Sequence, residues 1–442
     1  LLILANERAQ LATLTPRDVL VMIDPGALTT TDFSRGEALI AAGRRSLLAR
    51  SDALAGIVGQ RGRPARRAAA NAPSGTIEYV RVENGSRLDD AVLARKLDPL
   101  VGAPAEPRVI NAALDRVFAL GGFERVDYAL EQDGGRSGLL VRAEPAARGG
   151  GRIRLGLTLA NDSSDSDYAV SFDYRTNALD RYGSELQLQA TVGDRSAASA
   201  ELFRLLEPGQ NWFVAPRLEL VVRPARVFDS SGFEVGAYDL TYGGASLAAG
   251  YQFGSLGEVR AGLERGRGHA EAREGSVTPR SFQFDIGRAF AEAGVDTLDN
   301  PYFPRSGVRA SMRWVRGVPS LGDTSAFETL SVGALTALTR DRDTVLLGLS
   351  GGSNLAGATP LDARFRLGGL FRLSGYHPDE LSGDSFALAQ VIYRRTVVQP
   401  ALNLLGSQLY LGFSLEAGQV WARRTDVALD NPTVAGSVYV GA

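Results

Sequence analysis

The sequence of 442 residues contains no cysteine, which excludes disulfide bonds, thiolate metal sites and cysteine nucleophiles. It contains only two histidines, His269 and His377, too few for a histidine-based metal cluster. No apolar run is long enough for a membrane-spanning helix, and Leu1–Ala5 is too short for a signal sequence. The net charge of -2 gives no reason to expect nucleic acid as a partner. No nucleophile stands with a base, so we predict no catalytic residue, cofactor or metal here.

Glycine is abundant, with 51 residues, and alternating strand patterns fill the C-terminal two-thirds of the chain. From Val308 to Trp314, for example, apolar residues alternate with Arg309, Ser311 and Arg313. A period of two predicts a strand with one apolar and one polar face. We count about 14 such segments after Gly151, most of them near the ~10 residues that a tilted membrane-spanning strand needs.

Two architectures share this alternation. A soluble sandwich buries the apolar faces between two sheets, whereas a membrane barrel turns them to lipid around a polar lumen. Arginines and acids recur on the polar faces, where a packed core would bury them as misplaced charge. Trp212, Trp314 and Trp421 lie near predicted strand ends, as in an interfacial girdle. We therefore predict a β-barrel with Phe284 and Ile286 on its lipid face, and keep a soluble all-β binding protein as an alternative.

The N-terminal part has a different pattern. Residues 1–58 indicate an α/β piece, with a buried strand at Val19–Ile23 and a helix at Phe33–Leu54 capped by Thr31 or Asp32. Such a piece is too small to bury a core alone. Residues 59–75 are rich in Arg, Ala, Pro and Gly without periodicity and indicate a linker.

Residues 76–146 predict a small α+β domain in the order strand, helix, helix, strand, strand. The second helix has Ile110, Leu114, Val117 and Phe118 on one face. Asp133-Gly134-Gly135 is predicted to be the turn of the last hairpin. The expected elements are Thr76–Val82, Asp89–Leu97, a helix starting at Glu106 or Pro107, Phe123–Leu130 and Leu139–Ala143.

Two stretches in this half resemble known families. Asp18–Gly26 and Thr31–Gly43 resemble the end of a patatin-like phospholipase domain. That family uses a G-x-S-x-G serine, which is absent from this sequence, and an Asp-Gly-Gly motif, which Asp133–Gly135 matches only by letters. Leu120–Asp127 resembles the G-x-F-x-x-V hairpin entry of a POTRA (polypeptide-transport-associated) domain, whose sheet edge could accept an added strand.

The barrel region resembles the bacterial surface antigen superfamily, the barrels of outer-membrane assembly factors and two-partner secretion transporters. Asp299–Val308 resembles its turn motif, Gly369–Tyr376 its sixth outer loop and Glu416–Trp421 its D-x-G-x-V-W strand. The resemblance implies a mainly β fold: a 16-stranded-type barrel over residues 147–442, incomplete in this chain. It also implies a preceding POTRA-like domain in the periplasm. We expect both ends of the sequence to be truncations.

The outer loop departs from the family pattern. Leu373, Ser374, Gly375 and Tyr376 occupy its core, with Ser374 where most members have arginine. The resemblance implies that this loop folds into the lumen against an acidic strand residue, here Glu416; a surface turn is the alternative. Arg372 is expected to point away. The candidate lumen partners are Glu416, Arg309, Arg313 and Arg372.

Together these resemblances imply a type Vd autotransporter: an outer-membrane anchor and translocator for a patatin-like lipid acyl hydrolase passenger. The alternative is a general outer-membrane assembly factor or two-partner secretion transporter, which the serine at position 374 weakens. The expected location is the bacterial outer membrane. The expected partners are outer-membrane lipid, the chain's own passenger and the barrel assembly machinery, with a homodimer left open.

Overall fold

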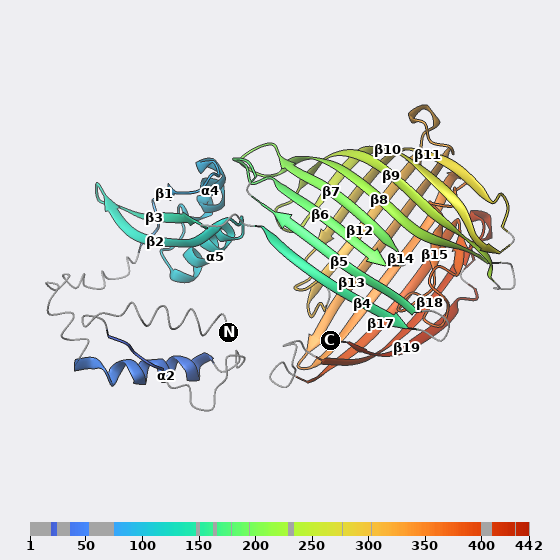
Figure 1. Ribbon diagram of the computed structural model, residues 1–442. Helices are drawn as coiled ribbons and strands as arrows, with labels where there is room; N and C mark the ends of the chain where they lie inside the picture. Colours follow the sequence, from blue (N-terminus) through green and yellow to red (C-terminus); the bar gives the residue numbers. More distant parts are fainter. Residues whose placement is uncertain are drawn as a thin grey trace. The chain divides into compact units, whose positions relative to one another are not determined.

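The computed structural model describes residues 19–23, 36–52, 75–146, 151–161, 166–177, 179–193, 195–228, 234–275, 277–301, 303–398, 409–428 and 430–441. The largest element is one antiparallel sheet, and a smaller α+β region precedes it in the chain (Figure 1). Contacts divide the chain into two units, Leu1–Ser74 with Val397–Leu409 and Ala442, and Gly75–Thr396 with Tyr410–Gly441. The predicted linker lies outside the described residues, except for Gly75.

In the first unit, helix α2 spans Gly36–Leu48, inside the predicted helix Phe33–Leu54. The predicted caps, Thr31 and Asp32, lie outside the described residues. The predicted buried strand Val19–Ile23 is wrong, because these residues have no strand assignment and Met22 is 76% exposed. An apolar run becomes a strand only beside another strand, and no described residues pair with this one.

The α+β region has the predicted order of elements, together with a short 3-10 helix. Its sheet has the order β1-β3-β2, with β1 parallel and β2 antiparallel to β3. Ile110, Leu114 and Val117 of the second long helix enter the core as predicted, but Phe118 is exposed at the helix end. The elements are β1 (Tyr79–Asn84), α4 (Asp90–Leu97), η2 (Asp98–Leu100), α5 (Pro107–Phe118), β2 (Phe123–Asp133) and β3 (Arg136–Pro145).

The Asp133-Gly134-Gly135 stretch is a hairpin turn, as predicted. Asp133 pairs with Arg136, and Gly134 and Gly135 have φ angles of 58° and 81°. Two successive positive φ angles suit glycine and match the right-handed twist of a hairpin.

Fourteen strands form one sheet in the order β19-β18-β17-β14-β13-β12-β11-β10-β9-β8-β7-β6-β5-β4, which confirms the predicted number. The sheet curls into a barrel (Figure 1). The strands are β4 (Arg152–Asn161), β5 (Ser166–Thr176), β6 (Glu185–Gly193), β7 (Ser196–Leu205), β8 (Trp212–Phe228), β9 (Glu234–Gln252), β10 (Gly257–Gly275), β11 (Ser281–Asp296), β12 (Gly307–Gly317), β13 (Phe327–Arg340), β14 (Asp343–Gly357), β17 (Ser385–Val398), β18 (Leu409–Trp421) and β19 (Thr433–Gly441).

The barrel has two ends, which we name by chain direction. The near end is the one at which β4 begins, and it holds the turn of residues 297–306 between β11 and β12. The far end holds residues 318–326 and 358–384. Because all neighbouring strands are antiparallel, successive connections alternate between the two ends.

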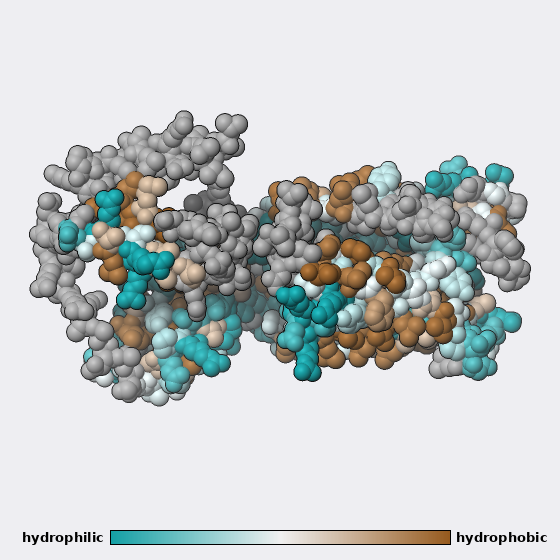
Figure 2. Space-filling view, turned by 90° about the horizontal axis from the view of Figure 1, so that it is seen from below, coloured by the Kyte–Doolittle hydropathy of each residue, from teal (hydrophilic) through white to brown (hydrophobic). Residues whose placement is uncertain are grey.

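Apolar side chains cover the outer face of the barrel. Leu155 on β4 is 78% exposed and Leu349 on β14 is 66% exposed. Figure 2 shows such residues gathered on the exterior of the barrel in that view. Exposed apolar residues on successive strands form a surface whose contact with water is unfavourable and whose contact with lipid is favourable. The predicted lipid face is therefore present on most strands.

One part of that prediction is wrong. Phe284 and Ile286 of β11 point inward, where they pack in a buried cluster with Leu240 of β9 and Leu361. Asp285, which lies between these two residues in β11, points to the outer face of the barrel and pairs there with Arg267. These are the far-end parts of the long strands. Alternation shows that one face is apolar, but not whether lipid or another part of the protein covers it.

Trp421 corrects the predicted aromatic girdle. It is buried, whereas Trp212 at the near end of β8 is exposed and meets Tyr251 edge-on with ring centroids 5.0 Å apart. Trp212 therefore suits a membrane interface, and Trp421 belongs to the protein interior.

Candidate functional site

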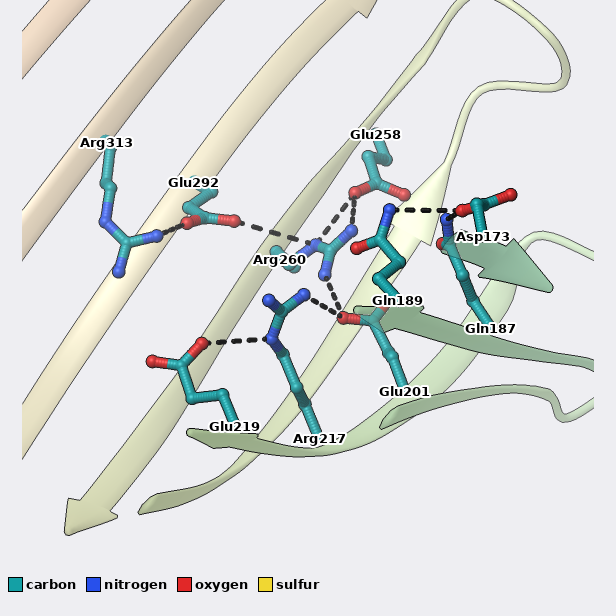
Figure 3. A network of polar contacts seen from close by, with 10 residues as sticks. All are labelled: Asp173, Gln187, Gln189, Glu201, Arg217, Glu219, Glu258, Arg260, Glu292 and Arg313. Carbon is teal, nitrogen blue, oxygen red and sulfur yellow. Dashed lines mark hydrogen bonds and ion pairs between the residues drawn. The ribbon is translucent and has the colours of Figure 1, made fainter. Parts of the chain in front are cut away.

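Charged side chains line the inner face of the barrel from β7 to β12 (Figure 3). Arg260 on β10 lies 3.6 Å from Glu201 and 3.8 Å from Glu292, and also pairs with Glu258. Arg217 on β8 lies 3.6 Å from Glu201 and so extends the network to the next strand. These ion pairs connect β7, β8, β10 and β11, and β9 between β8 and β10 contributes only small side chains to this lining, Ser246 and Ala248 among them.

Further polar side chains lie on both sides of this network. Arg313 on β12 pairs with Glu292, and Arg217 also lies 3.3 Å from Glu219. On β5, Asp173 accepts hydrogen bonds from Gln187 and Gln189 at 2.8 and 3.2 Å. Most of these side chains are partly exposed, so each pair adds little stability. What the set provides is a solvated polar lining, including a cavity of about 210 Å³ bounded by Glu201, Glu219, Glu264 and Glu292.

The connection between β14 and β17 folds against this interior, and we call residues 365–384 the inward loop. Its ends pair as β15 (Phe365–Leu367) and β16 (Leu381–Gly383). Leu373 in its middle is completely buried and packs in one cluster with Leu388 on the inner face of β17. The surface-turn alternative is therefore wrong for this loop, because its central side chain packs inside the barrel.

The tip of the inward loop is held by Glu416 of β18. Ser374 donates to the Glu416 carboxylate from its backbone N–H and, at 2.9 Å, from its hydroxyl. Ser414 donates its hydroxyl to the same carboxylate. Glu416 has no exposed surface. Hydrogen bonds to a charged group contribute about 1.5–3 kcal/mol each, so these donors satisfy a buried carboxylate without an arginine.

The residues leading into the loop are held by a buried ion cluster. Arg288 of β11 pairs with Asp362 and lies 3.3 Å from Asp323, and all three are mostly buried. Arg223 of β8 donates to the Asp362 carbonyl at 3.1 Å. Removing one partner from such a cluster leaves an uncompensated buried charge. This cluster attaches the start of the loop to β8 and β11, whereas Glu416 attaches its tip to β18.

The loop backbone is strained at several positions. Phe371, Leu373 and Asp379 have φ angles of 64°, 73° and 64°, although none is glycine. Such conformations cost about 1–3 kcal/mol each and persist only where surrounding contacts impose them. The side-chain contacts of Leu373 and the 2.8 Å pair between Asp379 and Arg195 supply such contacts here.

The predicted lumen partners separate into two groups. The structure brings Glu416 to Ser374, but it places Arg309 with Asp296 and Arg313 with Glu292 on the β11–β12 wall. Within the described part of the chain, Arg372 forms no hydrogen bond or ion pair with Glu416, and its Nη2 donates to the Arg366 carbonyl at 2.7 Å. Gly375 has a φ of 105°, and Tyr376 packs partly against the Leu373 cluster.

Sequence reasoning missed Arg288, Asp323 and Asp362. Arg288 and Asp362 lie 74 positions apart, and each alone resembles an ordinary strand or loop charge. No motif connects them, so only the fold reveals the contact. Among the described residues, no group of three or more His, Asp or Glu could hold a metal ion.

Residues 149–437 match the family model described as the Omp85 superfamily domain. The chain belongs to the Omp85 superfamily. An Omp85 barrel resides in the bacterial outer membrane, which accounts for the apolar exterior and the charged lumen. This membership replaces the alternative of a soluble all-β binding protein. None of the helices in the described segments has the length and apolarity to span a membrane.

Solved Omp85-type barrels have the same fold. BamA from Haemophilus ducreyi lacking POTRA domains 1-3 is 14% identical with a TM-score of 0.57, over 78% of this chain and 72% of that one. CdiB from Acinetobacter baumannii is 12% identical with a TM-score of 0.54, over 99% and 90%. CdiB from Escherichia coli is 14% identical with a TM-score of 0.52, over 99% and 88%. No curated protein matches the chain in sequence.

Proposed function

We propose that this chain is an outer-membrane pore that handles polypeptides, with the inward loop as its gate. In this proposal the near end and the α+β region face the periplasm. The observation that carries the proposal is the Ser374–Glu416 contact inside a charged, solvated lumen. A polar lining lets a hydrophilic chain pass without binding to an apolar surface, and a long loop that is attached at a few separate sites can be released from them.

The proposal covers secretion across the membrane and assembly into it. Both need an aqueous interior and a removable obstruction. The similarity to the CdiB structures extends over nearly the whole chain and to BamA over about three quarters of it, which supports both without separating them.

One reconstitution experiment separates the two activities. The purified chain in phospholipid vesicles is offered an unfolded small β-barrel polypeptide and, separately, an unfolded polypeptide without membrane-spanning strands. Faster appearance of heat-modifiable, folded barrel indicates assembly. Protease-protected polypeptide inside the vesicles indicates secretion. If vesicles with the protein match empty vesicles in both assays, the proposed function is wrong.

The pore itself has its own readout. Single-channel conductance in planar bilayers should rise when residues 369–378 are deleted, because the loop then no longer occupies the lumen. The matched control is Arg267→Ala, which removes an exposed charge at the outer far-end rim. Equal conductance of the parent and loop-deleted proteins would contradict the gate.

A second candidate is the anchor of a patatin-like acyl hydrolase passenger, from the resemblance of residues 18–43. Helix α2 supports it to a limited extent, because Ile40, Leu47 and Leu48 are exposed and suit a larger domain that covers them. Release of fatty acid from phospholipid vesicles by the natural gene product tests this candidate. No release above that of vesicles alone would remove it.

A further inference from the structure

Aromatic rings gather around Arg394 at the near end of β17. The guanidinium lies 5.5 Å from the ring centroid of Phe303 and 5.1 Å from that of Tyr410. These two rings stack, with centroids 4.8 Å apart and planes 16° apart. Phe303 belongs to the near-end turn of residues 297–306, so this stack fixes the turn against the barrel wall.

Arg394 depends strongly on this turn. It is 4% exposed, and its Nη2 donates to the carbonyl of Pro304, which follows Phe303. Its Nε has no hydrogen-bond partner, and among the described residues no acid forms an ion pair with it. A buried cation without a carboxylate is costly, and here cation–π contacts and one carbonyl offset that cost. Moving the turn would remove most of them.

The same turn shares a core with the inward loop. Ala337, Leu346 and Ile392 form a buried cluster on the inner faces of β13, β14 and β17. Leu298 of the near-end turn packs against this cluster, and so does Phe371 of the inward loop. One set of buried side chains therefore supports two segments that enter the barrel from opposite ends.

A second route joins the same segments. Phe371 meets Tyr439 of β19 edge-on, with ring centroids 5.0 Å apart and planes at 77°. Arg394 interacts electrostatically with Tyr439 and stacks with Phe303. Ile392 and Arg394 lie two positions apart on the same face of β17, so the buried cluster and the aromatic stack are neighbours.

We propose that the near-end turn controls the inward loop. Seating of Phe303 beside Arg394 holds Leu298 in the shared core, and displacement of the turn releases Phe371 and loosens the loop. The occupant that displaces the turn is a polypeptide arriving at the near end. This inference rests on the proposed function for the loop as gate. It requires that the inward loop has two arrangements, docked and released, and that the position of the near-end turn shifts the equilibrium between them.

The test uses the absence of cysteine. Leu373→Cys places one thiol at a completely buried position of the docked loop. A small thiol reagent then labels it only when the loop releases, so the labelling rate reports the docked–released equilibrium. In this background, Phe303→Ala should raise the labelling rate about fivefold, although Phe303 lies on the turn and not on the loop.

The controls separate coupling from general damage. Phe253→Ala removes an exposed aromatic residue from another near-end turn and should leave the rate unchanged. Phe303→Leu keeps much of the apolar contact and should give a smaller increase. Heat-modifiable migration shows that each variant is folded. In the double variant with Phe371→Ala, the increase should be smaller than the product of the single effects, because both changes break one unit.

A labelling rate for Phe303→Ala within twofold of the parent would overturn the coupling, as would an equal rise for Phe253→Ala. Multiplicative single effects would also overturn it. The readout needs no substrate. A positive labelling result with no polypeptide activity would therefore preserve the coupling and remove the proposed function, and the reverse result would do the opposite.

Discussion

Ser374 of the inward loop donates two hydrogen bonds to the buried carboxylate of Glu416 on β18. This contact occupies the position where the superfamily resemblance implies an arginine and an acid. The backbone N–H and the hydroxyl of Ser374 reach a shorter distance than an arginine side chain would. The loop backbone itself must therefore lie close to β18.

Glu416→Ala should undock the loop tip, because it leaves the backbone N–H and the hydroxyl of Ser374 without their acceptor. We expect a cost of about 3 kcal/mol for Glu416→Ala and about 1.5 kcal/mol for Ser374→Ala. Trypsin cleavage at Arg372 in the folded protein measures the released fraction. Ser331→Ala on the inner face of β13 is the matched control and should change nothing. Cleavage as slow as in the parent would show that the contact does not hold the loop.

Asp362→Asn should weaken the opposite anchor by about 3 kcal/mol, since Arg288 then keeps a buried charge with Asp323 alone. Thermal unfolding in detergent measures the loss of stability, and trypsin cleavage at Arg372 measures the release of the loop. The exposed pair Arg267–Asp285 serves as comparison, and Arg267→Ala should cost at most about 1 kcal/mol. Similar losses for the two variants would show that burial of the cluster contributes nothing.

Leu349→Arg should impair membrane assembly, because Leu349 lies on the outer face of β14. An arginine near the bilayer midplane costs about 2–4 kcal/mol in a barrel. Ser350→Arg, one position along and facing the lumen, should be tolerated. The heat-modifiable fraction in the outer membrane measures both. Tolerance of Leu349→Arg together with failure of Ser350→Arg would reverse the assignment of the faces.

The near-end turn should loosen in acid. Backbone N–H groups of Arg305 and Ser306 donate to Asp299 and hold the pKa of that carboxyl below its usual value. A lowered pKa means that the stabilisation is present above the unfolded value, about 3.9, and is lost as pH falls through the folded value. Hydrogen exchange of the 305 and 306 amides, corrected for intrinsic rates, should lose protection below about pH 4. Asp299→Asn should abolish this pH dependence; protection that persists at low pH in the parent would contradict it.

The sequence predicts the strands well because a period of two follows directly from backbone geometry. Leu155, Leu218 and Phe413 stand on the predicted outer face. Ile286 does not, since alternation carries no information on which medium covers the apolar face. The contact of Glu416 with Ser374 was accessible through a family resemblance. The contacts of Asp362 with Arg288 and of Phe303 with Arg394 were not, because long-range pairs leave no local pattern.

Strand length differs around the barrel, from 9–11 residues in β4 to β7 to 16–19 residues in β8 to β11. At about 3.3 Å per residue, the longer strands extend well past the hydrocarbon layer while the shorter ones barely cross it. If the near end faces the periplasm, as proposed above, the β8–β11 flank of the barrel projects beyond the outer surface of the membrane, and the β4–β7 flank stays level with the lipid. Antibodies raised against intact cells would accordingly recognise the β8–β11 hairpins far more often than those of β4–β7.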